Sequence, residues 1–337
     1  MNMYQWTETM KTSLVKKALP ILSFPGIQLM EGVTVRSLVQ DSRLQAACMK
    51  EVADHIDSAA SVSLMDLSVE AEAFGAETVM FDEDLPVVRS ALVSSLEEAQ
   101  ELEVPSVYDK RTRVYIEAIR LVKPQITDRP VLAGGIGPFS LTGRLVDVSE
   151  AMIYCYEEPE ILHVLLEKCV EFSINYIREL KKAGADGVVL AEPLAGMISP
   201  EHERVFSAPY VKRIVEVVQD ENFIVVYHNC GNYTYLMTES ISQNGCRVFH
   251  FGNSVDMGQM LQKMPQDVLV MGNIEPSGQF RNGTPESISA ATACLLETCG
   301  TCRNFIPSSG RDIPPMSPWD NIHAFFDSVK SYYHTKG

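Results

Sequence analysis

The sequence of 337 residues lacks a long hydrophobic run, because no apolar stretch approaches the roughly 18–20 residues of a transmembrane helix. The N-terminus also lacks a charged segment followed by an apolar stretch, so neither a membrane span nor an export signal is indicated. Basic residues are scarce, with 28 Lys and Arg against 44 Asp and Glu and a formal net charge of −16. This balance argues against nucleic acid or an anionic membrane as a partner. We expect a cytoplasmic protein.

Cysteines form no disulfide framework in this chain. The eight cysteines are scattered, and in a reducing compartment such residues are more often buried thiols or metal ligands. Cys299 and Cys302 are spaced C-x-x-C, but they precede a predicted strand, whereas His228 and Cys230 follow one. A five-residue strand spans roughly 16–17 Å, which zinc bonds of about 2.0–2.3 Å cannot bridge. We interpret Cys299 and Cys302 as structural thiols.

The sequence does contain a regular alternation of short β-rich runs with long helical patterns. The predicted strands lie at 61–66, 130–136, 187–192, 223–227, 247–251, 268–273 and 304–308, and helices are predicted at 157–184, 200–219, 284–298 and 317–333. Repeated units of this kind are typical of a parallel sheet. No Gly-x-Gly-x-x-Gly follows an early strand, which disfavours a dinucleotide-binding fold. We predict an α/β protein with a (β/α)8 barrel of the TIM type.

The N-terminal region has a different pattern. Helical stretches near 7–18 and 36–56 flank a connection at 20–33 that contains proline and glycine, and we expect residues 1–60 to form a helical cap on a barrel of residues 61–337. Residues 74–125 look like an insertion after the first strand, with a strand near 78–81 and helices near 95–103 and 109–122. No linker is long enough to divide the chain, so a single domain of residues 1–337 is predicted.

Polar residues follow most of the predicted strands. Because the active sites of such barrels lie at the carboxyl ends of the strands, we expect these residues to form one site. We assign a catalytic role to Asp66, Glu192 and Arg311, and we assign substrate binding to Ser140, Asn253, Asn273 and Ser309. Each also has a simpler interpretation, since an acid or amide at a strand end often only caps a helix or forms a turn.

His228 and Cys230 form the most informative pair in the sequence. They end an apolar run, and because residues two apart in an extended chain share a face, the imidazole and the thiol point the same way. This pair suits Zn²⁺, but a zinc site needs at least three protein ligands and the dipeptide supplies two. The alternative is a buried cysteine beside a histidine that is hydrogen-bonded to a neighbouring strand.

Several motifs together resemble the uroporphyrinogen decarboxylase superfamily, and within it the cobalamin-dependent methyltransferases. The likeness covers roughly residues 60–335 and rests on the segments at 135–140, 191–196, 228–232, 272–276 and 308–315. The resemblance implies a corrinoid-dependent methyltransferase that moves a methyl group between a methylcorrinoid carrier protein and a small-molecule acceptor such as a thiol. In that branch zinc is bound by a His-x-Cys pair, which matches His228 and Cys230, and by a second cysteine.

The second cysteine of the resembled family falls at Arg311 in this sequence. Arginine cannot bind zinc, so two possibilities stay open: a third ligand such as Glu192 or His250, or loss of the metal with Arg311 holding a substrate carboxylate. Two other functions remain as alternatives. One is a cofactor-free decarboxylase that uses Asp66, although residues 1–60 lack the arginine-rich motif of the porphyrinogen decarboxylases. The other is a non-catalytic protein that binds a corrinoid or its carrier.

Overall fold

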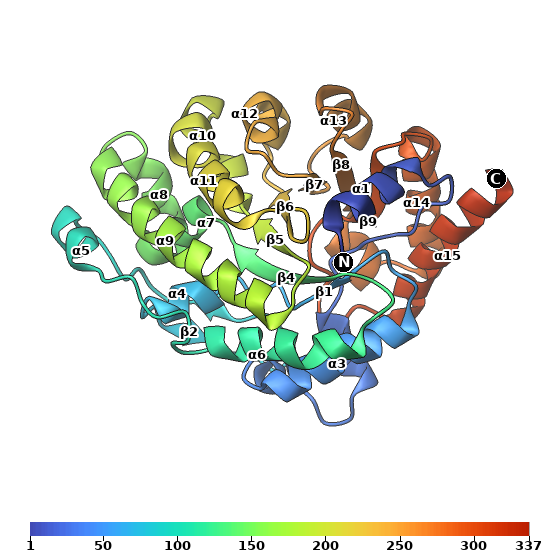
Figure 1. Ribbon diagram of the computed structural model, residues 1–337, viewed down its shortest axis with the longest axis horizontal. Helices are drawn as coiled ribbons and strands as arrows, with labels where there is room; N and C mark the ends of the chain where they lie inside the picture. Colours follow the sequence, from blue (N-terminus) through green and yellow to red (C-terminus); the bar gives the residue numbers. More distant parts are fainter. Residues whose placement is uncertain (337) are drawn as a thin grey trace.

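Seven parallel strands form one curved sheet in the computed structural model, which describes residues 1–336 (Figure 1). In spatial order the strands are β1 (Ser61–Val62), β4 (Val131–Ile136), β5 (Gly187–Ala191), β6 (Ile224–Asn229), β7 (Val248–Phe251), β8 (Leu269–Ile274) and β9 (Phe305–Ser309). Every neighbouring pair is parallel. Each of these strands lies where the alternation of the sequence predicts one, so the α/β class and the parallel sheet are confirmed.

The extended segment 18–23 lies between the two edge strands, β1 and β9. Leu19 N–H donates to Pro307 O in β9 at 2.9 Å, and Ala59 N–H, just before β1, donates to Ala18 O at 2.9 Å. Pro20 interrupts any ladder because it has no N–H, and the segment is not a regular strand. Within the described residues the parallel sheet therefore has seven strands rather than the predicted eight. Segment 18–23, predicted as part of a cap and its connection, instead joins the edges of the sheet.

A separate apolar cluster fills the inside of the curved sheet. Its members are buried side chains of the strands, with Met3 and Met10 of α1 (Met3–Thr12) and Leu19 and Ile21 of the edge segment. Helix α1 lies at the amino ends of the strands, where Met3 N–H donates to Glu221 O at 2.6 Å. That end is covered by α1, so a ligand has access from the opposite end.

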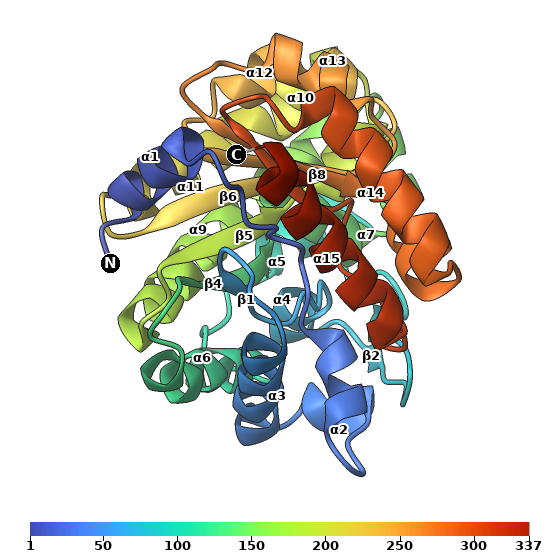
Figure 2. The same ribbon diagram turned by 90° about the vertical axis from the view of Figure 1, so that its right-hand side faces the viewer.

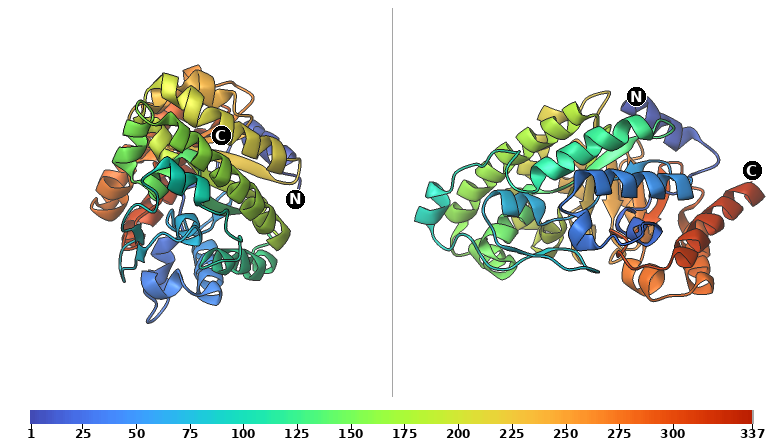
Figure 3. Two further views of the ribbon diagram at one scale, coloured as in Figure 1. Left: turned by 90° about the vertical axis from the view of Figure 1, so that its left-hand side faces the viewer. Right: turned by 90° about the horizontal axis from the view of Figure 1, so that it is seen from below.

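Helices lie outside the curved sheet, and most of them pack against its outer face or on one another (Figures 1 and 2). They are α2 (Val35–Leu38), α3 (Ser42–His55), α4 (Val69–Ala73), α5 (Leu96–Glu101), α6 (Thr112–Val122), α7 (Pro138–Val146), α8 (Val148–Tyr154), α9 (Pro159–Ala183), α10 (Pro200–Phe206), α11 (Ala208–Val218), α12 (Thr238–Ser242), α13 (Met257–Lys263), α14 (Pro285–Cys299) and α15 (Trp319–Lys336). Helices α3, α6 and α9 pack in sequence on one flank, and α14 packs on α15. Figure 3 places α5 and α15 at opposite ends of the molecule.

The helix predicted at 200–219 is two helices in the structure. It breaks at Ser207, between α10 and α11, because Pro209 lies in the first turn of α11 and lacks the N–H that a continuous helix would need. Long α9 matches its prediction and ends at Gly184, whose φ of 110° lies in the left-handed region that favours glycine. No helix of residues 1–336 is long and apolar enough to cross a membrane.

The predicted insertion contains a short antiparallel hairpin of β2 (Thr78–Val79) and β3 (Val87–Val88). The sequence indicates a strand near 78–81, but β3 has no counterpart in the prediction because two-residue strands give too little alternation to detect. The loop of this hairpin extends over the carboxyl ends of the barrel strands, where Asp84, Leu85 and Pro86 line a cavity. The insertion therefore forms one wall of the candidate site.

Candidate active site

A cavity of about 500 Å³ opens at the carboxyl ends of the strands. Its walls come from segments far apart in the sequence, namely residues 65–68 after β1, the β2–β3 hairpin, α7, the ends of β5 and β6, and residues 311–315 after β9. His228, Cys230 and Arg311 all line it. The structure thus brings together the residue pair and the arginine that the sequence singles out.

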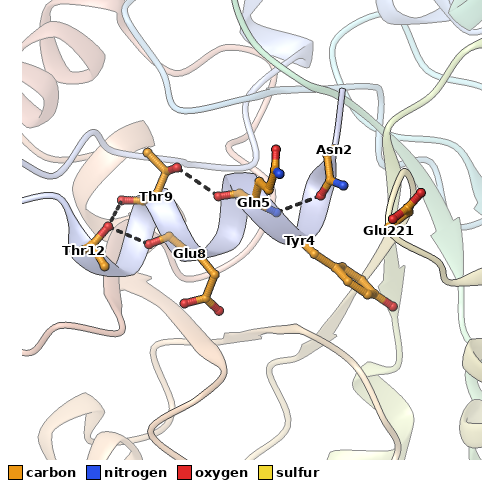
Figure 4. A pocket seen from close by; sticks show the side chains of 7 residues that line it. All are labelled: Asn2, Tyr4, Gln5, Glu8, Thr9, Thr12 and Glu221. Atoms are coloured by element: carbon orange, nitrogen blue, oxygen red, sulfur yellow. Dashed lines mark hydrogen bonds between the residues drawn. The ribbon is translucent and has the colours of Figure 1, made fainter.

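A larger groove of about 630 Å³ runs along α1 at the opposite end of the sheet (Figure 4). Its polar groups mainly serve the helix: Asn2 Oδ1 accepts from Gln5 N–H at 2.9 Å, and Thr9 Oγ1 donates to Gln5 O at 2.9 Å. Thr12 Oγ1 likewise donates to Glu8 O at 2.8 Å. The residues lining the groove include no histidine, cysteine or arginine, so we place the chemistry in the smaller cavity.

A chain of hydrogen bonds fixes the protonation of His228. His250 Nε2 lies 2.7 Å from the carbonyl oxygen of Ser309, and a carbonyl only accepts, so Nε2 carries the proton. Burial lowers the pKa of His250 to about 4, which leaves the ring neutral and its Nδ1 an acceptor. His228 Nδ1 lies 2.7 Å from that atom and must donate to it. In neutral His228 the lone pair therefore lies on Nε2, which can take a proton or a metal ion.

Burial also sets the state of the two side chains beside Arg311. It lowers the pKa of His228 well below its usual value, and the electrostatic interactions with His250 and with the Arg311 guanidinium lower it further. Burial raises the pKa of Cys230, although the Arg311 guanidinium opposes this shift. At neutral pH the cavity therefore presents a neutral imidazole and a protonated thiol beside a permanent cation.

Arg311 itself is exposed and makes one side-chain hydrogen bond, from Nη2 to Ser277 Oγ at 3.0 Å. Within the described residues, its other guanidinium N–H groups have no protein partner, so they can donate hydrogen bonds to a ligand. The next residue, Asp312, also contributes to the cavity wall, but both of its carboxylate oxygens are buried and without a hydrogen-bond partner. Burial raises the pKa of Asp312 well above its usual value. Nothing in the sequence pattern distinguishes Asp312 as a cavity residue.

Glu192 and Ser140 support the start of α7 rather than line the cavity. Glu192 is fully buried, and its oxygens accept from Phe139 N–H at 3.1 Å and Ser140 N–H at 2.5 Å. A carboxylate at a helix N-terminus is stabilised by the free amides and the helix dipole. Desolvation nevertheless raises its pKa to about 7. Ser140 Oγ in turn accepts from Leu194 N–H at 3.1 Å, which ties α7 to the loop after β5.

Asp66 belongs to a buried cluster beside the cavity. Its carboxylate pairs with Arg111, the residue just before α6, and it accepts from Ser68 Oγ at 2.6 Å and from Tyr115 Oη at 2.9 Å. The side chain of Asp66 has no exposed surface, and Arg111 also pairs with Glu72. Every acceptor position of Asp66 is thus oriented toward the protein. The sequence gives no signal for Arg111 because it lies at the start of a helix and not at the end of a strand.

The other three predicted substrate-binding residues lie around the cavity and do not line it. Asn273 Nδ2 donates to Gly252 O at 3.0 Å and to Val255 O at 2.8 Å, so it holds the loop after β7. Ser309 Oγ accepts from Ile21 N–H at 3.1 Å, within the edge contact. Asn253 is exposed. Their assignment to substrate binding remains a prediction.

The donors at the strand ends do not fit a zinc site of three protein ligands. Both nitrogens of His250 are engaged by His228 and the β9 end, and both oxygens of Glu192 bind the α7 amides. Arg311 occupies the remaining position and cannot bind a metal ion. Within residues 1–336 no group of three or more His, Cys, Asp or Glu side chains is arranged to hold a metal ion. His228 and Cys230 are left as an incomplete pair.

A curved parallel sheet of half-barrel form, with outer helices and a polar cavity at the carboxyl ends of its strands, defines an α/β protein whose candidate site lies where enzymes with parallel barrels have theirs. More specifically, the chain belongs to the uroporphyrinogen decarboxylase (URO-D) family, whose family model matches residues 26–332. The family resemblance noted from the sequence is thereby confirmed.

Curated relatives of two kinds are similar to the chain. A uroporphyrinogen decarboxylase of Coxiella burnetii is 28% identical over 286 residues, covering 81% of this chain and 77% of the relative. The methylcobamide:CoM methyltransferase MtbA of Methanosarcina acetivorans is 27% identical over 272 residues, covering 79% and 78%. A solved methyltransferase from Methanosarcina mazei shares the fold, with a TM-score of 0.85, 22% identity and 98% of each chain covered. Decarboxylases and methyltransferases are thus about equally similar in sequence.

Proposed function

We propose that this protein is a methyltransferase that moves a methyl group between a methylcorrinoid and a small acceptor such as a thiol. The main support for this proposal is that His228, with a free lone pair on Nε2, and Arg311, with its permanent charge, line the same cavity. Similarity to MtbA, a methylcobamide:CoM methyltransferase, supports the corrinoid as co-substrate. A corrinoid carrier protein would then be the partner that docks over the cavity mouth.

The arrangement suits activation of a thiol without a metal ion. A guanidinium beside a bound thiol lowers the pKa of that thiol, because the thiolate is the form that the cation stabilises. Neutral His228 accepts a hydrogen bond from the thiol at Nε2, and His250 keeps the ring in the required tautomer. The thiol proton passes to solvent, because the lowered pKa of His228 prevents the ring from holding it. The thiolate sulfur then forms a bond to the methyl carbon, while the methyl–cobalt bond breaks and leaves its electron pair with the corrinoid. Arg311 would supply the positive charge that a zinc ion supplies in the resembled methyltransferases.

The decarboxylase alternative has less support from the cavity. Uroporphyrinogen carries a carboxylate on every side chain, and two arginines, Arg144 and Arg311, line the cavity. Residues 1–60 contribute only Ile21 to its lining, so no N-terminal cation reaches it. Asp66, the acid proposed to stabilise a developing cation, is buried and paired with Arg111. These features favour a smaller substrate with fewer acidic groups.

The direct test is transfer from methylcobalamin to a panel of thiols, with corrinoid absorbance and thioether mass as readouts. We expect demethylation of the corrinoid with a thiol acceptor, and a loss of about 100- to 1,000-fold in Arg311→Gln, as for removal of a charge-stabilising group at an active site. Arg113→Gln is the matched control, since Arg113 is exposed on α6 and does not line the cavity.

Two outcomes would count against the proposal. Release of CO₂ from uroporphyrinogen, without demethylation of any corrinoid, would assign the chain to the decarboxylases. Absence of both activities, with retained corrinoid binding, would leave the non-catalytic binder as the better account.

A further inference from the structure

A further hollow, of about 290 Å³, lies apart from the active-site cavity and shares no residue with its lining. It opens between residues 15–18, residues 55–57 at the end of α3, and one face of α15. Its volume is at the lower end of the range for small-ligand sites, about 300–1,000 Å³. We call it the histidine cleft, because His55, His323 and His334 line it.

The exposed histidines of the protein all lie in this cleft. Of the seven histidines in the chain, only His55, His323 and His334 are exposed, although they come from two helices far apart in the sequence. His55 Nδ1 lies 2.8 Å from the carbonyl oxygen of Glu51 and 3.9 Å from its carboxylate, which leaves Nε2 for other contacts. Within residues 1–336, the rings of His323 and His334 have no hydrogen-bond partner. The cleft therefore offers several free ring nitrogens to a ligand.

A buried cation also lines the cleft. Lys16 is 5% exposed. Its ammonium uses its three protons on the carbonyl oxygens of Met10, Lys11 and Arg303, and no carboxylate of residues 1–336 pairs with it. Burial and the charge of Arg303 lower the pKa of Lys16 to about 8. Because a buried charge without an opposite charge is costly, an anion in the cleft would stabilise the charged form of Lys16.

The other charges of the cleft nearly cancel while its histidines are neutral. Lys17 pairs with Asp57 at 2.6 Å, and Lys330 and Asp327 have no ion-pair partner within the described residues. With Lys16 included, three lysines against two aspartates leave a formal charge of +1 with neutral histidines and +4 with all three protonated. Since histidine gains its charge between about pH 5 and 8, acidification makes the cleft a cationic site. A cleft of one sign of charge concentrates ligands of the opposite sign.

The remaining lining of the cleft is apolar. Ala18, Ile56 and Val329 are buried, and Phe326 of α15 is half-buried. Such a surface favours a hydrocarbon or aromatic group, whereas the lysines and protonated histidines favour an acidic one. A ligand that satisfies both parts of the lining carries an acidic group on a compact apolar body.

We propose that the histidine cleft binds a small organic anion with an apolar body, and that acidification strengthens this binding. The cleft lies beside the edge contact of the sheet, where Ser58 Oγ donates to Ala18 O at 3.1 Å. A bound anion would therefore join residues 15–18, the end of α3 and α15. This inference does not depend on the proposed methyl transfer.

Benzenesulfonate is a suitable probe because its charge is constant across the range in which histidine titrates, and benzenesulfonamide is its uncharged counterpart. Calorimetric titration of the full chain would compare the two compounds at about pH 6 and about pH 8. We expect the sulfonate to bind about 10-fold more tightly at the lower pH, since each histidine charge adds a modest attraction at an exposed position. The sulfonamide should bind weakly at both values.

The histidine ring protons provide a local readout of the same titration. In NMR spectra, we expect the sulfonate to shift the ring signals of His55, His323 and His334, each assigned by its glutamine variant. The signals of buried His228 and His250, beside the active-site cavity, should not move.

Two variants separate the cleft from other cationic positions. Lys330→Gln should weaken sulfonate binding by about 2- to 5-fold, whereas Lys212→Gln, at an exposed position of α11 away from the cleft, should not. Arg311→Gln should also leave the affinity unchanged, because Arg311 lines only the active-site cavity. Equal binding at the two pH values, equal binding of sulfonate and sulfonamide, or loss of binding in Arg311→Gln would overturn the inference. Unmoved signals of the three cleft histidines would overturn it as well.

Discussion

Two hollows at opposite ends of the sheet differ both in size and in the chemistry of the residues that line them. The groove along α1 is the larger, at about 630 Å³ against about 500 Å³ for the cavity at the strand ends. Hydroxyls and an amide in the groove are used by α1 itself, whereas Arg144, Arg311 and His228 Nε2 keep free hydrogen-bonding capacity. The kind of polar group, namely two arginines, a histidine and a cysteine, thus marks the functional end of the molecule better than volume does.

The largest effect is expected where a buried polar group is fully paired. Asp66→Asn removes one of the two carboxylates that pair with buried Arg111 and leaves Glu72, so we expect a loss of about 3 kcal/mol in the free energy of unfolding, the lower end of the range for a broken buried pair. Asp82→Asn is the control, since its pair with Arg36 at 2.9 Å is exposed and should contribute about 0–1 kcal/mol. Urea denaturation measures both. Equal losses in the two variants would remove the distinction between paired structural groups and free functional ones.

A second variant tests the hydrogen-bond chain behind His228. His250→Phe leaves His228 Nδ1 buried without its acceptor, so the fixed tautomer is lost. We expect methyl transfer to fall about 10- to 100-fold, as for loss of a group that orients a functional histidine. The control is His163→Phe, which also breaks a bond of 2.7 Å, to Tyr210 Oη, but lies away from the cavity. Full activity in His250→Phe would show that the hydrogen bonds from His228 through His250 to Ser309 O have no functional role.

The third variant uses pH to test whether Glu192 is structural. Burial raises the pKa of Glu192 to about 7, from 4.5, so the folded protein binds more protons than the unfolded chain between these values. Stability from this group is complete below the unfolded pKa and is lost as the pH rises through about 7. Glutamine cannot ionise, so Glu192→Gln should become more stable relative to the wild type as the pH increases through this window.

Denaturation curves between about pH 4.5 and 8 measure this slope. Glu297→Gln on the exposed side of α14 is the matched control. A constant difference between Glu192→Gln and the wild type at every pH would contradict the expectation. A loss of activity in Glu192→Gln beyond its loss of stability would restore the catalytic role predicted from the sequence.

The smallest effect belongs to the groove along α1. Thr9→Ala removes a hydroxyl that bonds only within the helix, at an exposed position, so we expect a stability change within about 0.5 kcal/mol and no change in methyl transfer. The free energies of unfolding of Thr9→Ala and the wild type, and their rates in the corrinoid assay, are the quantities to compare. A clear loss of activity would show that the larger groove takes part in function.

The sequence predicts much of the sheet because parallel strands buried on both faces leave apolar runs with sharp ends. Each run from 130 to 308 has its strand, and the polar residues after β6 and β9 do meet in one cavity. The position of segment 18–23 at the edge of the sheet could not be predicted in this way, because Pro20 lacks the N–H that a regular strand would need there. Its role depends on contacts with Pro307 and Ala59, which are distant in the chain.

The composition of the site is only partly visible in the sequence. Strand-end position identifies His228, Cys230 and Arg311, but it does not distinguish a side chain that faces the cavity from one that supports a helix, such as Glu192. Arg144 lies within α7, where spacing along the chain gives no sign that its guanidinium reaches the cavity. Three-dimensional pairing decides these roles, and pairing depends on residues from other strands and helices.

The proposal that Arg311 takes the place of a metal ion is tested most directly by methyl transfer in metal-free protein. The protein would be dialysed against a chelator, its zinc content measured, and transfer from methylcobalamin to a thiol followed before and after one equivalent of zinc is added. We predict an unchanged rate in both states, with a gain in zinc affinity only in Arg311→Cys. Loss of transfer on zinc removal, with recovery on its return to the wild type, would contradict this account.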